Sequence, residues 1–280
     1  MKWTTHYQNK SVLVTGGSSG IGLALSNRLF ELGASVFILA RRPDQLEVAR
    51  KEIETHRVNS QQKIGILEGS VANLEQITEL LHDFILRNGT PDLLINSAGI
   101  THPVEFVNTP IEIFRAMMDV NFFGIVHTTK ILAPLMIERG SGHIINISSA
   151  AAIVGAYGYT AYAASKYAVR GFTDTLRAEL KPLGVRCSLV LPADVNTPQL
   201  EYETPIKPFV TREFSKTAKV IQPEYVAKVV LRAAARGKYL IIPGADTHLL
   251  YHVTNLMGAK TQTILVDSII ASAFRRKNQS

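Results

Sequence analysis

Three polar side chains in the middle of the chain have the types and spacing needed for acid–base chemistry at a carbonyl oxygen. Lys166 follows Tyr162 by four residues, and Ser149 precedes Tyr162 by thirteen. On a helix, Tyr162 and Lys166 share one face, so a lysine ammonium can act on a phenol whose free pKa is near ~10. Ser149 can polarise the oxygen that receives the proton. Three neighbouring tyrosines lack such partners, and we expect their rings to pack in the core: Tyr157, Tyr159 and Tyr167.

A second group of residues has the types needed to bind the phosphates of a nucleotide. The sequence Thr-Gly-Gly-Ser-Ser-Gly-Ile-Gly, from Thr15 to Gly22, follows the apolar run 12–14 and precedes a helical pattern. A strand, a glycine turn and a helix N-terminus present N–H groups and the helix dipole to an anion, and glycines let it approach. A turn that only needs positive φ is the alternative. We predict a pyrophosphate cradle formed by Gly16, Ser18, Ser19, Gly20, Ile21 and Gly22.

Alternating apolar and amphipathic segments must position these residues. The patterns predict strands at 11–15, 35–40, 63–68, 91–95, 142–147, 185–191 and 239–243, and helices at 20–32, 43–57, 73–88, 109–138, 160–182 and 223–236. The strands are apolar without strict alternation, which is typical of parallel strands buried on both faces. We therefore expect an α/β fold, a doubly wound, Rossmann-like parallel sheet in a single domain, with ligands at the carboxyl ends of the strands.

Unusual residues follow six of these strands and predict one site along that edge. They are Gly16–Gly22, Arg41 and Arg42, Ser70 and Val71, Asn96–Gly99, Ser148 and Ser149, and Pro192–Pro198. Arginines after the second strand favour NADPH, because a guanidinium pairs with a 2′-phosphate whereas an acidic residue would accept the ribose hydroxyls of NAD. We assign the main role to Arg41, which is nearer to the strand.

Composition narrows the class of protein. The chain has 280 residues, 46% of them hydrophobic, and a net charge of +7. The charge suits an anionic cofactor or membrane surface, but no Arg-rich stripe with interleaved aromatics occurs, so we expect no nucleic acid partner. The single cysteine, Cys187, lies in an apolar run and suggests a reducing compartment. The sequence Met1–His6 has no apolar segment, so we expect a cytoplasmic protein, at most peripherally attached to a membrane. We expect no bound metal.

From about residue 10 to about residue 245 the chain resembles the short-chain dehydrogenase/reductase family. The Thr15–Gly22 turn, Asn96–Gly99, Ser149 and Tyr162-x-x-x-Lys166 agree in order and spacing. The resemblance implies that Ser149, Tyr162 and Lys166 are catalytic, that an oxidised nicotinamide and the lysine together favour the phenolate, and that Asn121 holds a water next to the lysine. It also implies further cofactor contacts, from Ser70, where the family usually has Asp, and from Val71, Asn96, Ala98, Gly99, Tyr162, Lys166, Val195 and Thr197.

A narrower likeness lies in the segment at about 193–222, which we expect to be an irregular or helical substrate loop. Pro192–Pro198, Lys207-Pro208 and Gln222–Ala227 look like the same region of 3-ketodihydrosphingosine reductases. This likeness implies a long-chain lipid ketone as substrate, 3-ketosphinganine, reduced with NADPH. Other lipid, steroid or acyl-thioester ketones, and a non-catalytic NADP-binding role, stay open. Gln45 departs from the basic residue that those enzymes carry.

The C-terminal tail and the oligomeric state complete the expectations. We divide the chain into a catalytic domain, 1–260, and a tail, 261–280. Apolar residues at helical spacing precede Arg275-Arg276-Lys277 and predict an amphipathic helix over 262–277: Ile264, Leu265, Ile269, Ile270 and Phe274. Such a helix can rest on an anionic membrane, cover the substrate pocket or form a dimer contact. The family resemblance implies a homo-oligomer that pairs through helices 109–138 and 160–182.

Overall fold

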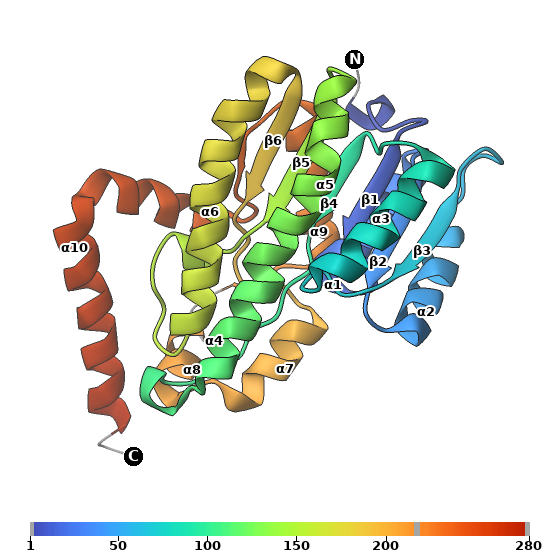
Figure 1. Ribbon diagram of the computed structural model, residues 1–280. Coiled ribbons are helices and arrows are strands. Elements are labelled where there is room, and N and C mark those ends of the chain that lie inside the picture. The colour runs from blue at the N-terminus through green and yellow to red at the C-terminus, as the bar shows by residue number, and fades with distance from the viewer. Residues whose placement is uncertain (1–2, 216–218, 278–280) are drawn as a thin grey trace.

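The computed structural model describes residues 3–215 and 219–277, whose centre is a seven-stranded parallel sheet (Figure 1). Its strands lie in the order β3-β2-β1-β4-β5-β6-β7, so the chain crosses over after β3 and builds the sheet outward in both directions from β1. This is the doubly wound topology that the sequence predicts. The strands are β1 (Ser11–Thr15), β2 (Ser35–Ala40), β3 (Ile64–Glu68), β4 (Leu93–Asn96), β5 (Gly142–Ile147), β6 (Val185–Val190) and β7 (Leu240–Ile241).

Helices cover both faces of the sheet, and Figure 1 views it from the side of α3, α5 and α6. Within β1, Val12 and Val14 pack against α1, α2 and α9, while Leu13 packs against α3 and α5 on the other face. Successive side chains of a strand point to opposite faces, which explains the continuous apolar strands. The helices are α1 (Gly20–Glu31), α2 (Pro43–Glu54), α3 (Leu74–Asn88), α4 (Ile111–Met117), α5 (Gly124–Glu138), α6 (Thr160–Leu180), α7 (Pro198–Ile206), α8 (Phe209–Ser215), α9 (Pro223–Ala235) and α10 (Ala245–Lys277).

The helix expected at 109–138 is interrupted by a π-helical turn, Met118–Phe123, between α4 and α5. Asn121 lies in this turn and is fully buried. Its Oδ1 accepts the N–H of Ile100 at 2.8 Å, and its Nδ2 donates to the Ile100 carbonyl at 3.0 Å and to Ser165 Oγ at 2.9 Å. The wider turn thus lets one side chain link the loop after β4 to α6, a common use of π-turns at functional sites.

The stretch Ile111–Glu138, which contains that turn, is the one among the described residues that is long and apolar enough to span a membrane. Its apolar side chains are also those expected of a helix that covers a sheet. Leu132, Ala133 and Met136 are buried against the sheet in the core shared with α3. Length and composition are therefore weak evidence for a membrane span here.

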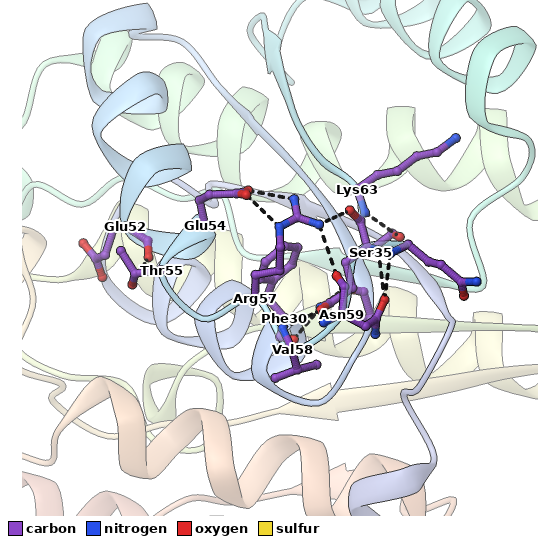
Figure 2. Close-up of polar contacts among 12 residues, drawn as sticks. Phe30, Ser35, Glu52, Glu54, Thr55, Arg57, Val58, Asn59 and Lys63 are labelled. Carbon is purple, nitrogen blue, oxygen red and sulfur yellow. Dashed lines mark hydrogen bonds and ion pairs between the residues drawn. The ribbon is translucent and has the colours of Figure 1, made fainter.

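At the amino ends of β2 and β3, the connection from α2 is held by a buried polar network (Figure 2). Arg57 donates to both carboxylate oxygens of Glu54 and, at 2.5 Å, to the Gln62 carbonyl. The buried Gln62 side chain donates to the carbonyls of Phe30 (2.6 Å) and Ala34 (3.0 Å). Its Oε1 accepts the N–H groups of residues 58 and 59. These bonds satisfy backbone groups that an irregular connection would otherwise leave unpaired.

The segment at 193–222 contains two short helices, α7 and α8, and its two ends are tied together. Val195 and Ile221 form an isolated parallel bridge. The Ile221 N–H donates to the Asp194 carbonyl at 3.0 Å, and the Asn196 N–H donates to the Ile221 carbonyl at 2.9 Å. The segment therefore leaves and returns at one point beyond the carboxyl end of β6.

The C-terminal helix is longer than the sequence pattern indicates. We expected it at 262–277, but α10 begins at Ala245 and runs without a break across the division placed at 260/261. It lies at the side of α6 in Figure 1 and contacts α8. The side chains of Leu265 and Ile269, and residues 278–280, lie outside the described part of the tail.

Candidate active site

A cavity of about 1460 Å³ opens at the carboxyl ends of the strands. Ligand sites in doubly wound sheets lie at this edge, and the volume exceeds the ~300–1000 Å³ of a pocket for one drug-sized ligand. Fourteen of the predicted site residues line it: Gly16, Ser19, Gly20, Ile21, Gly22, Arg41, Arg42, Ala98, Gly99, Ser149, Tyr162, Lys166, Val195 and Thr197. Five others are absent from its lining: Ser18, Ser70, Val71, Asn96 and Asn121.

Ser149, Tyr162 and Lys166 converge in this cavity. Tyr162 lies in the first turn of α6, and its side chain and that of Ser149 line the same cavity. Ser149 caps the 3-10 turn Ala150–Ala152 and accepts the Ala151 N–H at 3.1 Å. Lys166 Nζ lies 5.6 Å from the centre of the Tyr162 ring and donates to the Ile147 carbonyl at 3.1 Å. The Ser148 hydroxyl, in contrast, donates to the Lys166 carbonyl.

Burial decides the protonation of this group. It raises the pKa of the Tyr162 phenol, and the negative charge of Glu203 adds to the rise, while hydrogen bonds to Ser149 and Gln199 oppose it. Burial also lowers the pKa of Lys166 to about 8. The phenolate that we expect also requires the positive charge of an oxidised nicotinamide, and the chain's own groups alone do not favour it, because desolvation of the phenolate dominates. Tyr162 keeps its proton at neutral pH, as a proton donor to a ketone must.

Asn121 lies behind this group rather than in the cavity wall. A Cβ atom added to Gly99 would lie 3.4 Å from Asn121 Oδ1 and 3.6 Å from Lys166 Nζ. Gly99 therefore lies where both polar atoms come within van der Waals contact of an added Cβ. The water that the resemblance assigns to Asn121 stays a prediction.

The glycine turn has the shape of a phosphate cradle. Gly16 and Gly20 have positive φ, +67° and +53°. A Cβ at Gly16 would lie 2.8 Å from the Ala98 backbone, and one at Gly22 would lie 2.2 Å from the Gly16 carbonyl oxygen, so neither position admits a side chain. Ser19 is the N-cap of α1 but makes no side-chain capping bond, which leaves its hydroxyl and the first N–H groups for an anion. These features fit a dinucleotide pyrophosphate.

Two arginines face the same end of the cavity. Arg41 and Arg42 follow β2 and are exposed, and no ion pair is recorded for either in residues 3–215 and 219–277. A free guanidinium beside a phosphate cradle fits a further phosphate group, because the fork geometry suits bidentate pairing.

The remaining predicted cofactor residues form supporting structure. The Ser70 N–H donates to Gln76 Oε1 at 2.9 Å, and the Val71 carbonyl lies 2.8 Å from His127 Nδ1. Asn96 is buried and joins β4 to Asn146 on β5 at 2.9 Å. The structure thus gives these side chains and backbone groups partners within the protein.

Tyr157 and Tyr159 are not the core residues that we expected, since both line the cavity. Tyr159 donates to Glu203 Oε2 at 2.5 Å, and Tyr157 packs edge-on against Phe274 of α10, with ring centres 6.0 Å apart. Tyr167 is 43% exposed and is not in the core either. For Tyr157 and Tyr159 the reason is that the segment before α6 borders the cavity.

Sequence reasoning also missed the contribution of α7. Gln199 and Glu203 lie four residues apart on this helix, so they share one face, and both line the cavity. That spacing was visible in the sequence, but a Gln-x-x-x-Glu pair alone is too common to indicate a site.

Helix α10 also contributes to the cavity wall, through Leu250, Thr254 and Ile270. Its end is held in place by an ion pair between Arg276 and Glu213 (3.6 Å) and by the buried Ala273.

Comparisons with known proteins agree with this architecture. The profile of the short chain dehydrogenase family matches residues 10–206. The 3-ketodihydrosphingosine reductase of Bos taurus is 34% identical over 87% of this chain and 74% of its own length. The 3-dehydrosphinganine reductase of Danio rerio is 35% identical over the same shares. Among solved structures, a 3-oxoacyl-[acyl-carrier protein] reductase from Brucella melitensis with bound NAD has a TM-score of 0.70 and 28% identity, covering 81% of this chain and 84% of that one.

The family profile covers well over half of the chain, and the relatives align across most of it. The solved reductase shares the fold and carries a nicotinamide cofactor. The chain belongs to the short-chain dehydrogenase/reductase family and is an oxidoreductase.

Proposed function

We propose that this protein reduces the ketone of 3-ketosphinganine with NADPH. One observation carries the proposal: Ser149, Tyr162 and Lys166 meet in one cavity that also holds a phosphate cradle. The substrate is inferred from the relatives in cow and zebrafish, which are named for this ketone.

Each group has a defined task in this mechanism. NADPH, when bound, supplies the hydride. Tyr162 donates its proton to the ketone oxygen, and the Ser149 hydroxyl polarises the same oxygen beforehand. Lys166 places a positive charge near the phenol, which stabilises the phenolate left after proton transfer. Asn121 holds the loop after β4 and the part of α6 next to Lys166 together through its bonds to Ile100 and Ser165.

The cofactor would be held along the edge of β1 and β2. The glycine turn would receive the pyrophosphate, and Arg41 and Arg42 would receive the 2′-phosphate that distinguishes NADPH from NADH. Val195 and Thr197 line the cavity between the turn and α7, where they would contact the nicotinamide half. A Cβ at Gly20 would lie 3.0 Å from Thr197, so the glycine turn and the start of α7 are close together.

The test is NADPH consumption by the purified chain with a panel of ketones. We expect the highest kcat/KM with 3-ketosphinganine, in comparison with a steroid ketone and a 3-oxoacyl thioester. A preference for the steroid ketone or the 3-oxoacyl thioester would change the proposed substrate but leave the proposed ketone reduction in place. Consumption with none of them would support a non-catalytic NADP-binding protein instead.

We also propose peripheral membrane contact through α10, because the proposed substrate is a long-chain lipid. Leu256, Ile264 and Phe274 are exposed on this helix, and Arg275 and Arg276 follow. Co-sedimentation with anionic vesicles at low salt should bring down the full chain and should weaken in an Ile264→Asp variant. If the unchanged chain stays in the supernatant, α10 acts only as a cover for the cavity or as a contact in the homo-oligomer that the family resemblance implies. Sedimentation velocity would then reveal such an oligomer.

A further inference from the structure

Glu203 is a buried carboxylate in the cavity wall that the mechanism above does not use. Its side chain is 7% exposed. Besides the short bond from Tyr159, its Oε1 accepts a hydrogen bond from Gln199 Nε2 at 3.3 Å. Gln199 and Tyr162 both line the cavity, and the Gln199 side-chain amide opposes the rise in the pKa of the Tyr162 phenol. One side-chain amide therefore acts on both Glu203 and the phenol that would donate to the ketone.

The charges around Glu203 do not balance. Lys207 Nζ lies 3.8 Å from Glu203 Oε2 and 3.7 Å from Asp194 Oδ2. Two carboxylates thus share one buried ammonium, and both distances are longer than a hydrogen bond. With both carboxylates ionised, the group keeps one negative charge that no described residue neutralises. The Asp194 side chain is 36% exposed, whereas that of Glu203 is buried, and a buried charge is costly unless it has a partner.

The negative field reaches the reaction centre. Glu203 and Asp194 both raise the pKa of Tyr162, which means that each disfavours a negative charge at the phenol. The same field favours a positive charge at that place. Burial raises the pKa of Glu203 itself, while Lys207, Tyr159 and Gln199 oppose the rise, so a cation beside the carboxylate would keep it ionised.

We propose that Glu203, assisted by Asp194, binds the ammonium group of an α-amino ketone substrate. The proposal rests on the proposed function, since 3-ketosphinganine carries its amine on the carbon next to the ketone carbon. The anionic cofactor is assigned to Arg41 and the glycine turn, so it does not account for a carboxylate at Glu203. With Tyr162 on the ketone oxygen and Glu203 on the ammonium, two neighbouring substrate groups are fixed at once. Glu203 is thereby a specificity-determining residue.

The test compares two substrates and two variants of the full chain, with NADPH present. The second substrate is 1-hydroxyoctadecan-3-one, in which hydrogen replaces the amine of 3-ketosphinganine. We expect the unchanged enzyme to prefer the amine by at least ~10-fold in kcat/KM, as for a charged hydrogen bond. Glu203→Gln should lose about 10- to 100-fold with the amino ketone, mainly through KM, and no more than about 2-fold with the amine-free ketone.

Glu201→Gln is the matched control, because Glu201 is exposed on the same helix and is absent from the cavity lining. Glu201→Gln should leave kcat/KM unchanged with both substrates. Activity of Glu203→Gln with the amine-free ketone also shows that the variant is folded. Equal losses with both ketones, or an unchanged enzyme that reduces both equally well, would overturn the role of Glu203 and leave the proposed function standing. An unchanged enzyme that reduces neither ketone would overturn the proposed function together with this inference.

Discussion

Replacing Lys166 with methionine should abolish turnover and make the protein more stable at neutral pH. The folded protein holds the lysine at a pKa of about 8, against 10.5 when exposed, because burial disfavours the charge. Carrying that charge at pH 7 therefore costs about 3 kcal/mol. Methionine removes the cost, but it leaves the Ile147 carbonyl without the 3.1 Å bond from Nζ, a loss of about 1 kcal/mol. The expected net gain is about 2 kcal/mol, or about 4 °C in Tm.

The pH dependence gives this prediction its sign. Between pH 8 and 10.5 the unfolded lysine still binds its proton while the folded one has released it, so rising pH stabilises the unchanged protein relative to the variant. The advantage of Lys166→Met should be constant below pH 8, shrink above it and reverse by pH 10.5. Thermal melts at several pH values, without added cofactor, measure this difference. Lys130→Met, at an exposed position on α5, is the control and should show no such trend. A variant that is less stable at pH 7, or a difference that does not change with pH, would refute the reasoning.

Three further substitutions test the site and the fold. Tyr162→Phe should lower kcat at least ~10²-fold by removing the proton donor and should leave NADPH binding, measured by fluorescence, nearly intact. The control Tyr167→Phe should not lower kcat. Near-normal turnover of Tyr162→Phe would exclude Tyr162 as the donor. Arg41→Ala should remove most of the preference for NADPH over NADH, about 1.5–3 kcal/mol in relative kcat/KM, and an unchanged enzyme that uses both cofactors equally would contradict the assignment. Gln62→Ala should lower the free energy of unfolding, measured by urea titration, by about 2–4 kcal/mol without changing kcat, because the Ala34 carbonyl loses its donor and the N–H groups of residues 58 and 59 lose their acceptor. The exposed Gln61→Ala should be neutral. An equal effect of the two glutamine variants would show that the network in Figure 2 contributes little.

The sequence predicted the sheet well because buried parallel strands are continuous apolar runs, and the ends of strands mark the ligand edge. It also predicted that Ser149, Tyr162 and Lys166 share one site, and all three side chains line the cavity. It could not predict the protonation of Tyr162, which depends on burial and on Glu203 from a distant helix. The π-turn at Asn121 was hidden as well, because an apolar pattern does not show one extra residue in a helical turn.

The start of α10 was missed for a related reason. Polar residues interrupt the apolar stripe after Ala245, and the helix is stabilised by contacts with α8 and the cavity that no local pattern records. The positions of Tyr157 and Tyr159 were missed for the same reason. Their surroundings come from segments far along the chain, Phe274 and Glu203, so their own neighbours in sequence gave no signal.

The bridge between Val195 and Ile221 closes off one segment of the chain from the rest of the fold. Ser149, Tyr162 and Lys166 belong to the sheet and α6, whereas Gln199 and Glu203 belong to a segment whose two ends are fastened to each other beside β6. Because the ends already meet, the loop between them can change in length and sequence at little entropic cost to the rest of the fold. The segment can therefore vary while the positions of Ser149, Tyr162 and Lys166 stay the same.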